Sequence, residues 1–410
     1  MAHDWTSVEV GLVLQGGGAL GAYEWGAIEA LFGLMDRVQQ HRPTSLKVVT
    51  GVSIGAVNGA CIVGAEDRAD GLTRLAKLWD TLRISTPFDL RIDLRPFGGP
   101  SFSPARDMAL FGLPGFYTPR MDMWNFWRWT SFYDNKMLKD TLDACVSFDR
   151  INSDGAPTTF VVSAVDVESG VLRRFRNKNR PPEAEPDRLE ESDRRVVFGP
   201  EHIMASGSLA PPFPWTPIES RDRQGELDIR NYWDGGLVDN TPLGDALEAF
   251  SEHTKVYRLL VVLNLYPLRG SLPKNLFDVA DRVHELSFGN RLRQDRAAAS
   301  RVNKLLHAVE GLRKIADPER LAHDKKLQDA VAEALRYKIA KTVEIDLQRP
   351  GVAQAPEDDE SGLRDFSSAT IARRREHGRA IAHHEIVRAL IHDKLLPPEA
   401  GKAARAAAGS

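Results

Sequence analysis

The sequence of 410 residues has only two cysteines, Cys61 and Cys145, and no long apolar run. Two cysteines without a paired spacing provide neither a disulfide framework nor a zinc-ligand set, which favours a reducing compartment. No stretch reaches the roughly 18 apolar residues of a membrane-spanning helix, and the first residues lack the basic and apolar regions of a signal peptide. We therefore expect a cytoplasmic protein, with peripheral membrane contact and signal-independent export left open.

An excess of charge of one sign is also missing. The 54 Lys and Arg residues nearly balance the 57 Asp and Glu residues, which leaves a net charge of −3. So small a net charge provides no general attraction to nucleic acid, and we expect no nucleic-acid partner. The spacings HxxxH and HExxH are absent from the sequence, so no metal and no other cofactor are expected.

A serine lies between two glycines in the motif Gly51-Val52-Ser53-Ile54-Gly55. A strand-like run precedes the motif and a helix-like run follows it. The sharp turn between such elements needs small residues two positions before and two positions after the serine. The pattern therefore predicts a nucleophile elbow with Ser53 as the nucleophile, rather than a tight turn with an idle serine.

Three consecutive glycines, Gly16, Gly17 and Gly18, follow an apolar strand-like run and precede Ala19, Gly21 and a helical pattern. Their bare N–H groups and the helix N-terminus can hold an oxyanion. A dinucleotide site would instead need an acidic residue at the end of the next strand. That strand ends in a threonine and the elbow, so a nucleotide cofactor is not expected.

Asp234 ends a short apolar run and is followed by Gly235 and Gly236. A carboxylate at this place can serve as the general base that a serine nucleophile needs. The alternative is an ordinary turn, in which the side chain only caps the two glycines. A Ser-His-Asp triad is disfavoured because His253, the best contender, falls in a polar segment at the amino edge of the expected sheet.

The order of the three motifs, together with the stretch Ala205–Pro214 before the aspartate, resembles the patatin-like acyl hydrolases over about Val8 to Asn264. The resemblance implies a Ser-Asp dyad, with Ser53 as nucleophile and Asp234 as its base. It also implies that the loop of Gly16, Gly17, Gly18 and Ala19 is the oxyanion hole. Many members carry Arg or Lys where this chain has Leu20, which leaves a preference for phospholipids open.

The resemblance and the motifs together predict a serine hydrolase of lipid or acyl esters, of the phospholipase A, lysophospholipase or esterase type. Two alternatives stay open from the sequence. One is an acyltransferase or thioesterase that uses the same acyl-enzyme, and the other is an inert lipid-binding protein. The identity of the ester, the oligomeric state and the need for an activator are not indicated.

Apolar runs with little alternation are typical of strands that are buried on both faces. Such runs occur at Val8–Leu14, Leu46–Val49, Thr158–Val165 and Val256–Leu265. Helical patterns alternate with them, at Trp25–Leu34, Leu72–Leu82 and Asn240–Phe250. This alternation predicts a three-layer α/β fold of the patatin type with a mostly parallel central sheet.

We expect a catalytic domain over residues 6–270 and a mainly helical C-terminal extension over residues 271–410, with a linker near 350–364. Residues 86–135 are expected to be an aromatic-rich insertion, in which the run Met123–Trp129 holds three of the eight tryptophans. Such a run suits an interfacial surface or a cap over an acyl-binding groove, and a small satellite core is the alternative. The basic run Arg373–Arg375 suits either an anionic membrane or a solvated helix face.

Overall fold

The computed structural model describes residues 5–84, 112–179, 195–221, 227–251, 253, 255–266, 340–346 and 363–397, with short stretches between 272 and 328. The first part of the expected insertion, most of the expected helical extension before residue 340, and most of the expected linker lie outside the described residues. Among the helices in these ranges, none has the length and apolarity needed to cross a membrane.

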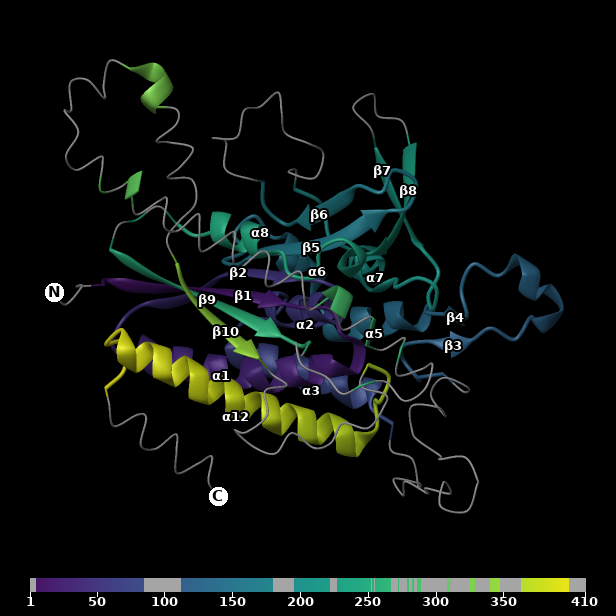
Figure 1. The fold of residues 1–410 in the computed structure, drawn as a ribbon, viewed down its shortest axis with the longest axis horizontal. Coiled ribbons are helices and arrows are strands. Elements are labelled where there is room, and N and C mark those ends of the chain that lie inside the picture. Colours follow the sequence, from purple (N-terminus) through teal and green to yellow (C-terminus); the bar gives the residue numbers. More distant parts are fainter. Residues whose placement is uncertain are drawn as a thin grey trace.

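A mixed sheet forms the centre of the fold (Figure 1). Its strands run in the order β10-β9-β1-β2-β5-β8-β7, and β6 pairs with the other side of β5. The strands from β10 to β5 are parallel, whereas the β5–β6, β5–β8 and β7–β8 pairs are antiparallel. The strand bounds are β1 Ser7–Leu14, β2 Thr44–Gly51, β5 Thr159–Asp166, β6 Leu172–Arg176, β7 Thr216–Arg221, β8 Leu227–Asp234, β9 Val256–Asn264 and β10 Lys341–Asp346.

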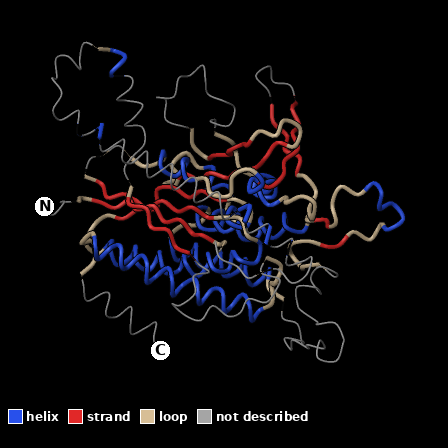
Figure 2. The backbone as a smooth tube through the Cα atoms, in the orientation of Figure 1, coloured by secondary structure: helices blue, strands red, loops and turns tan. Residues whose placement is uncertain are grey.

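Helices lie on both sides of this sheet (Figure 2), and a short hairpin of β3 and β4 stands apart from it. The longer helices are α1 Gly21–Gln39, α2 Ile54–Val63, α3 Arg68–Leu82, α5 Met137–Cys145, α7 Pro200–Gly207 and α12 Ser368–His392. The shorter elements are η1 Gly18–Leu20, β3 Thr118–Pro119, η3 Met123–Arg128, β4 Tyr133–Asp134, α6 Phe148–Asn152, η6 Gly235–Leu237 and α8 Leu243–Glu248.

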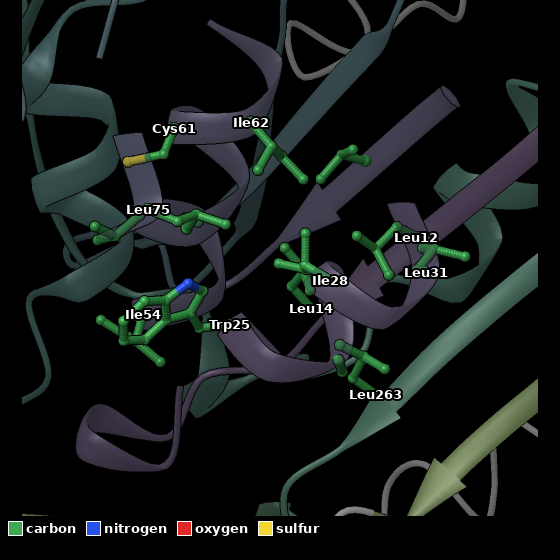
Figure 3. Close-up of a cluster of buried hydrophobic side chains, with 14 of the residues drawn as sticks. Leu12, Leu14, Trp25, Ile28, Leu31, Ile54, Cys61, Ile62, Leu75 and Leu263 are labelled. Carbon is green, nitrogen blue, oxygen red and sulfur yellow. The ribbon is translucent and has the colours of Figure 1, made fainter. Parts of the chain in front are cut away.

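The side chains of each central strand alternate between two apolar cores, because successive residues of a strand point to opposite faces. Leu12 and Leu14 of β1 belong to the larger core, beside Ile28 and Leu31 of α1 (Figure 3). Val13, between them, belongs to a smaller core on the other face, together with residues of α8. The helix–sheet–helix layering confirms the predicted three-layer α/β fold.

The part of the chain expected to be a separate extension adds to the same sheet and core. β10 pairs in parallel with β9 and forms one edge of the sheet, and α12 packs along α1 (Figure 1). The guanidinium of Arg375 lies 3.9 Å from the ring centre of Trp25 and pairs with Glu29, and Arg374 is buried. Among the described residues, β10 and α12 of the expected extension therefore pack on the expected catalytic domain, and Arg374 and Arg375 of the basic run contact aromatic rings of α1.

The contact between α1 and α12 leaves no room for a side chain at Gly26, because a Cβ there would overlap the carbonyl oxygen of Arg375. Gly26→Ala is therefore expected to lower the free energy of unfolding by about 1–3 kcal/mol, although alanine is the better helix former. Gly33→Ala in the same helix meets no atom within 4 Å, and should raise that free energy by about 0.5–1 kcal/mol. Urea unfolding of both variants measures the contrast, and equal stabilities would contradict the close contact.

Candidate active site

Ser53 lies in the turn between β2 and α2, at the carboxyl end of the parallel strands. Its φ of 54° and ψ of −125° are values that residues other than glycine rarely adopt. A Cβ on Gly51 would lie 2.6 Å from the carbonyl oxygen of Gly55, and a Cβ on Gly55 would lie 2.7 Å from that of Gln15. The steric need for both glycines therefore follows from how closely this turn approaches its neighbours.

The carboxylate of Asp234, the last residue of β8, lies beside Ser53. It accepts a hydrogen bond of 2.7 Å from the N–H of Gly236, and the hydroxyl of Ser53 is its other polar neighbour. Burial raises the pKa of Asp234 to about 7, and the N–H of Gly236 and the hydroxyl of Ser53 oppose that rise. Asp234 thus caps the turn of Gly235 and Gly236 and also lies beside a hydroxyl, so the cap leaves the carboxylate in a place where the role of base can be proposed.

Two N–H groups of the glycine loop are already engaged. The N–H of Gly16 donates to Oδ1 of Asn240 at 2.9 Å, and the N–H of Ala19 donates to the carbonyl oxygen of Leu363 at 3.0 Å. A donor that is used inside the protein is not aimed at a substrate oxygen. Of the four residues expected to form the oxyanion hole, Gly16 and Ala19 therefore have no N–H group available for a substrate oxygen.

The other two residues of the loop, Gly17 and Gly18, have N–H groups without an acceptor among the described residues. Both residues line the cavity that contains Ser53 and Asp234. The loop is close to the elbow, since a Cβ on Gly16 would lie 2.8 Å from Cβ of Ser53. The structure therefore brings a hydroxyl, a carboxylate and two N–H groups together around one space.

Three buried polar residues that were not predicted from the sequence hold these loops in place. The hydroxyl of Ser206 accepts the N–H of Ser53 at 2.9 Å. The side-chain amide of Asn240 accepts the N–H of Gly16 and donates to its carbonyl oxygen at 3.3 Å. The third residue is Glu24. The sequence positions of Ser206 and Asn240 could have indicated them. Ser206 lies in the stretch before the Asp-Gly-Gly motif, and Asn240 lies shortly after that motif.

Glu24 is buried in α1, and its hydrogen bonds hold the start of the glycine loop in position. Its carboxylate accepts the N–H of Gln15 at 2.8 Å and the side-chain amide of Asn58 at 3.0 Å. Gln15 in turn donates to the hydroxyl of Thr241 at 2.7 Å and accepts the N–H of Leu265 at 2.9 Å. Burial raises the pKa of Glu24 to about 8, although the bonds from Asn58 and Gln15 oppose it.

This raised pKa predicts a pH-dependent stability. Between about pH 4.5 and 8, the folded protein keeps a proton on Glu24 that the unfolded chain releases, so stability falls as the pH rises. Glu24→Gln cannot ionise, and over this window its free energy of unfolding should gain about 3–5 kcal/mol relative to the wild type. The contribution of Asp234 to the pH dependence of stability is the same in the wild type and in Glu24→Gln. Urea unfolding at pH 5 and pH 8 measures the change, and parallel pH profiles would contradict it.

The cavity around Ser53 has a volume of about 550 Å³ and mostly apolar walls. That volume lies in the range of small-molecule sites. Segments that are far apart in the sequence contribute aromatic side chains to it: Phe116, Tyr117, Phe132, Tyr133, Phe213, Tyr266, Phe288 and Phe366. Leu363 and Arg364, which fall in the linker expected from the sequence, also line the cavity.

The histidines considered from the sequence lie elsewhere. His253 is exposed and precedes β9, whose opposite end leads to the cavity. His202 lies in the first turn of α7, where its Nδ1 accepts the N–H of Gly199 at 3.1 Å. Leu20 is buried in the larger core, so the position that carries a cation in many similar proteins points away from solvent here.

Comparison with known proteins supplies a family and distant structural neighbours. The chain is similar in structure to VipD from Legionella pneumophila, at 12% identity and a TM-score of 0.34, over 93% of this chain and 67% of that one. It is similar to a chain of the heterodimeric ExoU–SpcU complex from Pseudomonas aeruginosa, at 15% identity and a TM-score of 0.27, over 97% and 65%. This chain thus spans about two thirds of the length of either neighbour.

No curated protein matches the sequence. The sequence profile of the patatin-like phospholipases matches residues 12–247, which is more than half of the chain and includes the elbow, the glycine loop and Asp234. The family supports lipid ester hydrolase activity. The chain belongs to the patatin-like phospholipase family.

Proposed function

We propose that the protein is a serine hydrolase that cleaves carboxylic esters of lipids through a Ser53–Asp234 dyad. The observation that carries the proposal is that the Ser53 hydroxyl and the buried carboxylate of Asp234 are neighbours in the lining of one apolar cavity. A serine hydroxyl is a weak nucleophile until an adjacent base accepts its proton. With a pKa of about 7, the carboxyl of Asp234 is matched to this exchange near neutral pH.

In the first half of the reaction, Oγ of Ser53 attacks the ester carbonyl carbon and its proton passes to Asp234. The electron pair of the C=O bond moves onto the oxygen, and the N–H groups of Gly17 and Gly18 are aimed at the charge that forms there. Preorganised donors of this kind stabilise the transition state more than the substrate. Collapse of the intermediate breaks the C–O bond, and the leaving alcohol takes the proton from Asp234.

In the second half, water attacks the acyl group on Ser53 and gives a proton to Asp234. A second oxyanion forms in the same place, and its collapse releases the fatty acid while Oγ of Ser53 takes the proton back. Each half therefore returns the carboxylate to its starting form. The apolar walls of the cavity suit the acyl chain better than a charged head group, which supports lipid esters as the substrate class.

Fatty-acid release tests the proposed function. The purified protein is incubated with p-nitrophenyl butyrate and, separately, with phosphatidylcholine vesicles, and Ser53→Ala provides the background. Hydrolysis of at least one substrate by the wild type alone supports the proposal. Labelled ester with added glycerol should yield free fatty acid as the main product, and acyl glycerol as the main product would identify a transferase instead. Equal activity of both proteins would remove Ser53 from the mechanism.

A further inference from the structure

The hairpin of β3 and β4 projects from the body of the molecule (Figure 1), and its connecting segment, residues 120–132, is called the apolar loop below. Six large apolar side chains of the loop are between 56% and 79% exposed. They are Met121, Met123, Trp124, Phe126, Trp127 and Phe132. The helical turn η3 within the loop has no buried residue, so these side chains form no satellite core.

Contiguous exposed apolar surface is rare on soluble proteins and marks a site of interaction. The neck of the loop is held by polar contacts, since Arg120 pairs with Asp122 at 2.9 Å and lies 5.4 Å from the ring centre of Trp129. The tip has a different character, in which Phe126 and Trp127 contact each other edge to face. The loop therefore presents an apolar end on a fixed stem.

The position of the loop indicates what contacts it. Phe132, at the end of the loop, is exposed and also lines the cavity of Ser53. The N–H groups of Phe132 and Tyr133 both donate to the carbonyl oxygen of Pro212, another residue of the cavity wall. The apolar surface of the loop is thus continuous with the apolar wall of the cavity, as a path for an acyl chain requires.

The charges of the hairpin indicate whether the apolar loop contacts a charged or an uncharged surface. From residue 118 to residue 134 it carries two arginines, Arg120 and Arg128, and two aspartates, Asp122 and Asp134, so its net charge is zero. A contact with anionic lipid or with a charged protein would be strengthened by an excess of one sign. Trp, Phe and Met side chains without such an excess suit the interface of an uncharged bilayer.

We propose that the apolar loop inserts into the surface of a zwitterionic lipid bilayer and places the mouth of the cavity against it. Delivery of an acyl chain along Phe132 is the part that rests on the proposed function. The contact itself does not depend on catalysis, so binding and hydrolysis can be tested apart.

Binding is measured by flotation with phosphatidylcholine vesicles, using Ser53→Ala protein so that the lipid stays intact. The test variant adds Met123→Ser, Trp124→Ser and Trp127→Ser. The control adds Val197→Ser, Leu227→Ser and Ile229→Ser, which remove exposed apolar side chains elsewhere. The test variant should bind at least about tenfold more weakly, and the control within about threefold of the parent. Thermal unfolding midpoints should be alike because all six side chains are exposed.

Three results would overturn the proposal: the parent does not bind these vesicles, the test variant binds as well as the parent, or binding requires anionic lipid and is lost between about 0.1 and 0.5 M salt. Self-association that the three loop substitutions abolish, without vesicle binding, would assign the loop to a second copy instead. In the active background, the same substitutions should lower hydrolysis of vesicles but not of p-nitrophenyl butyrate. If the protein cleaves no ester but its loop still binds the vesicles, the proposed hydrolase function is wrong and the proposed membrane contact stands.

Discussion

Asp234→Asn is expected to lower kcat/KM for p-nitrophenyl butyrate at pH 8 by about 10²- to 10⁴-fold, the range that a general base contributes. An asparagine still accepts the N–H of Gly236, so the turn is kept, but it cannot take the proton of Ser53. The pH profile is part of this expectation. In the wild type, kcat/KM should rise with pH and reach half its maximum near pH 7, because only the ionised carboxyl of Asp234 accepts a proton.

Asp166→Asn is the matched control. Asp166 is also buried at the end of a strand, β5, and its carboxylate also accepts backbone N–H groups, here two, from Glu168 at 3.0 Å and Ser169 at 2.8 Å. It does not line the cavity, and its replacement should change kcat/KM by no more than about threefold, as for an ordinary site outside the mechanism. Activity of Asp234→Asn above a tenth of the wild-type value, or a flat profile from pH 5 to pH 8, would contradict the role of Asp234.

Gly18→Ala is expected to lower kcat by about 10²-fold, which is the cost of losing one oxyanion donor. Gly18 has a φ of 52°, and a Cβ on it would lie 2.5 Å from the carbonyl oxygen of Leu363. The same carbonyl accepts the N–H of Ala19, so a displacement of Leu363 also loosens the loop. The substitution therefore moves the N–H groups of Gly17 and Gly18 away from the position of the oxyanion.

Gly170→Ala is the control that separates the effect of the close contact at Gly18 from the effect of backbone strain. Gly170 has a φ of 70°, and no atom lies within 4 Å of its Cβ position. This variant should lose stability as Gly18→Ala does through strain, but it should keep wild-type kcat. Steady-state kinetics at saturating ester and urea unfolding separate the two effects. If both variants kept full activity, Gly17 and Gly18 would not be the oxyanion donors.

The centre of the fold was predictable because its strands are local apolar runs. The four expected strands coincide with β1, β2, β5 and β9, and the elbow and glycine loop follow β2 and β1 directly. The glycines that the tight turns of the elbow and the glycine loop require form short local motifs, which can be recognised without knowing which distant residues lie nearby. The antiparallel pairs of β6 with β5 and of β7 with β8 were not predicted, because β6, β7 and β8 are rich in polar residues and carry a weaker apolar pattern.

The C-terminal residues show what sequence patterns leave out. Pairing of parallel strands depends on contacts far apart in the sequence, so the place of β10 beside β9 was not indicated. The same holds for Leu363, whose carbonyl oxygen contacts the glycine loop across more than 340 positions. Partners of buried polar residues such as Asn240 are likewise set by the assembled fold.

The central claim is that Ser53 is the nucleophile of this cavity, and a fluorophosphonate probe tests it most directly. The probe forms a phosphorus–oxygen bond to an activated serine with loss of fluoride. Tandem mass spectrometry of the labelled wild-type protein should locate one adduct, on Ser53, and Ser53→Ala should remain unlabelled. An adduct on a different serine in an active protein, with Ser53 unmodified, would contradict the account.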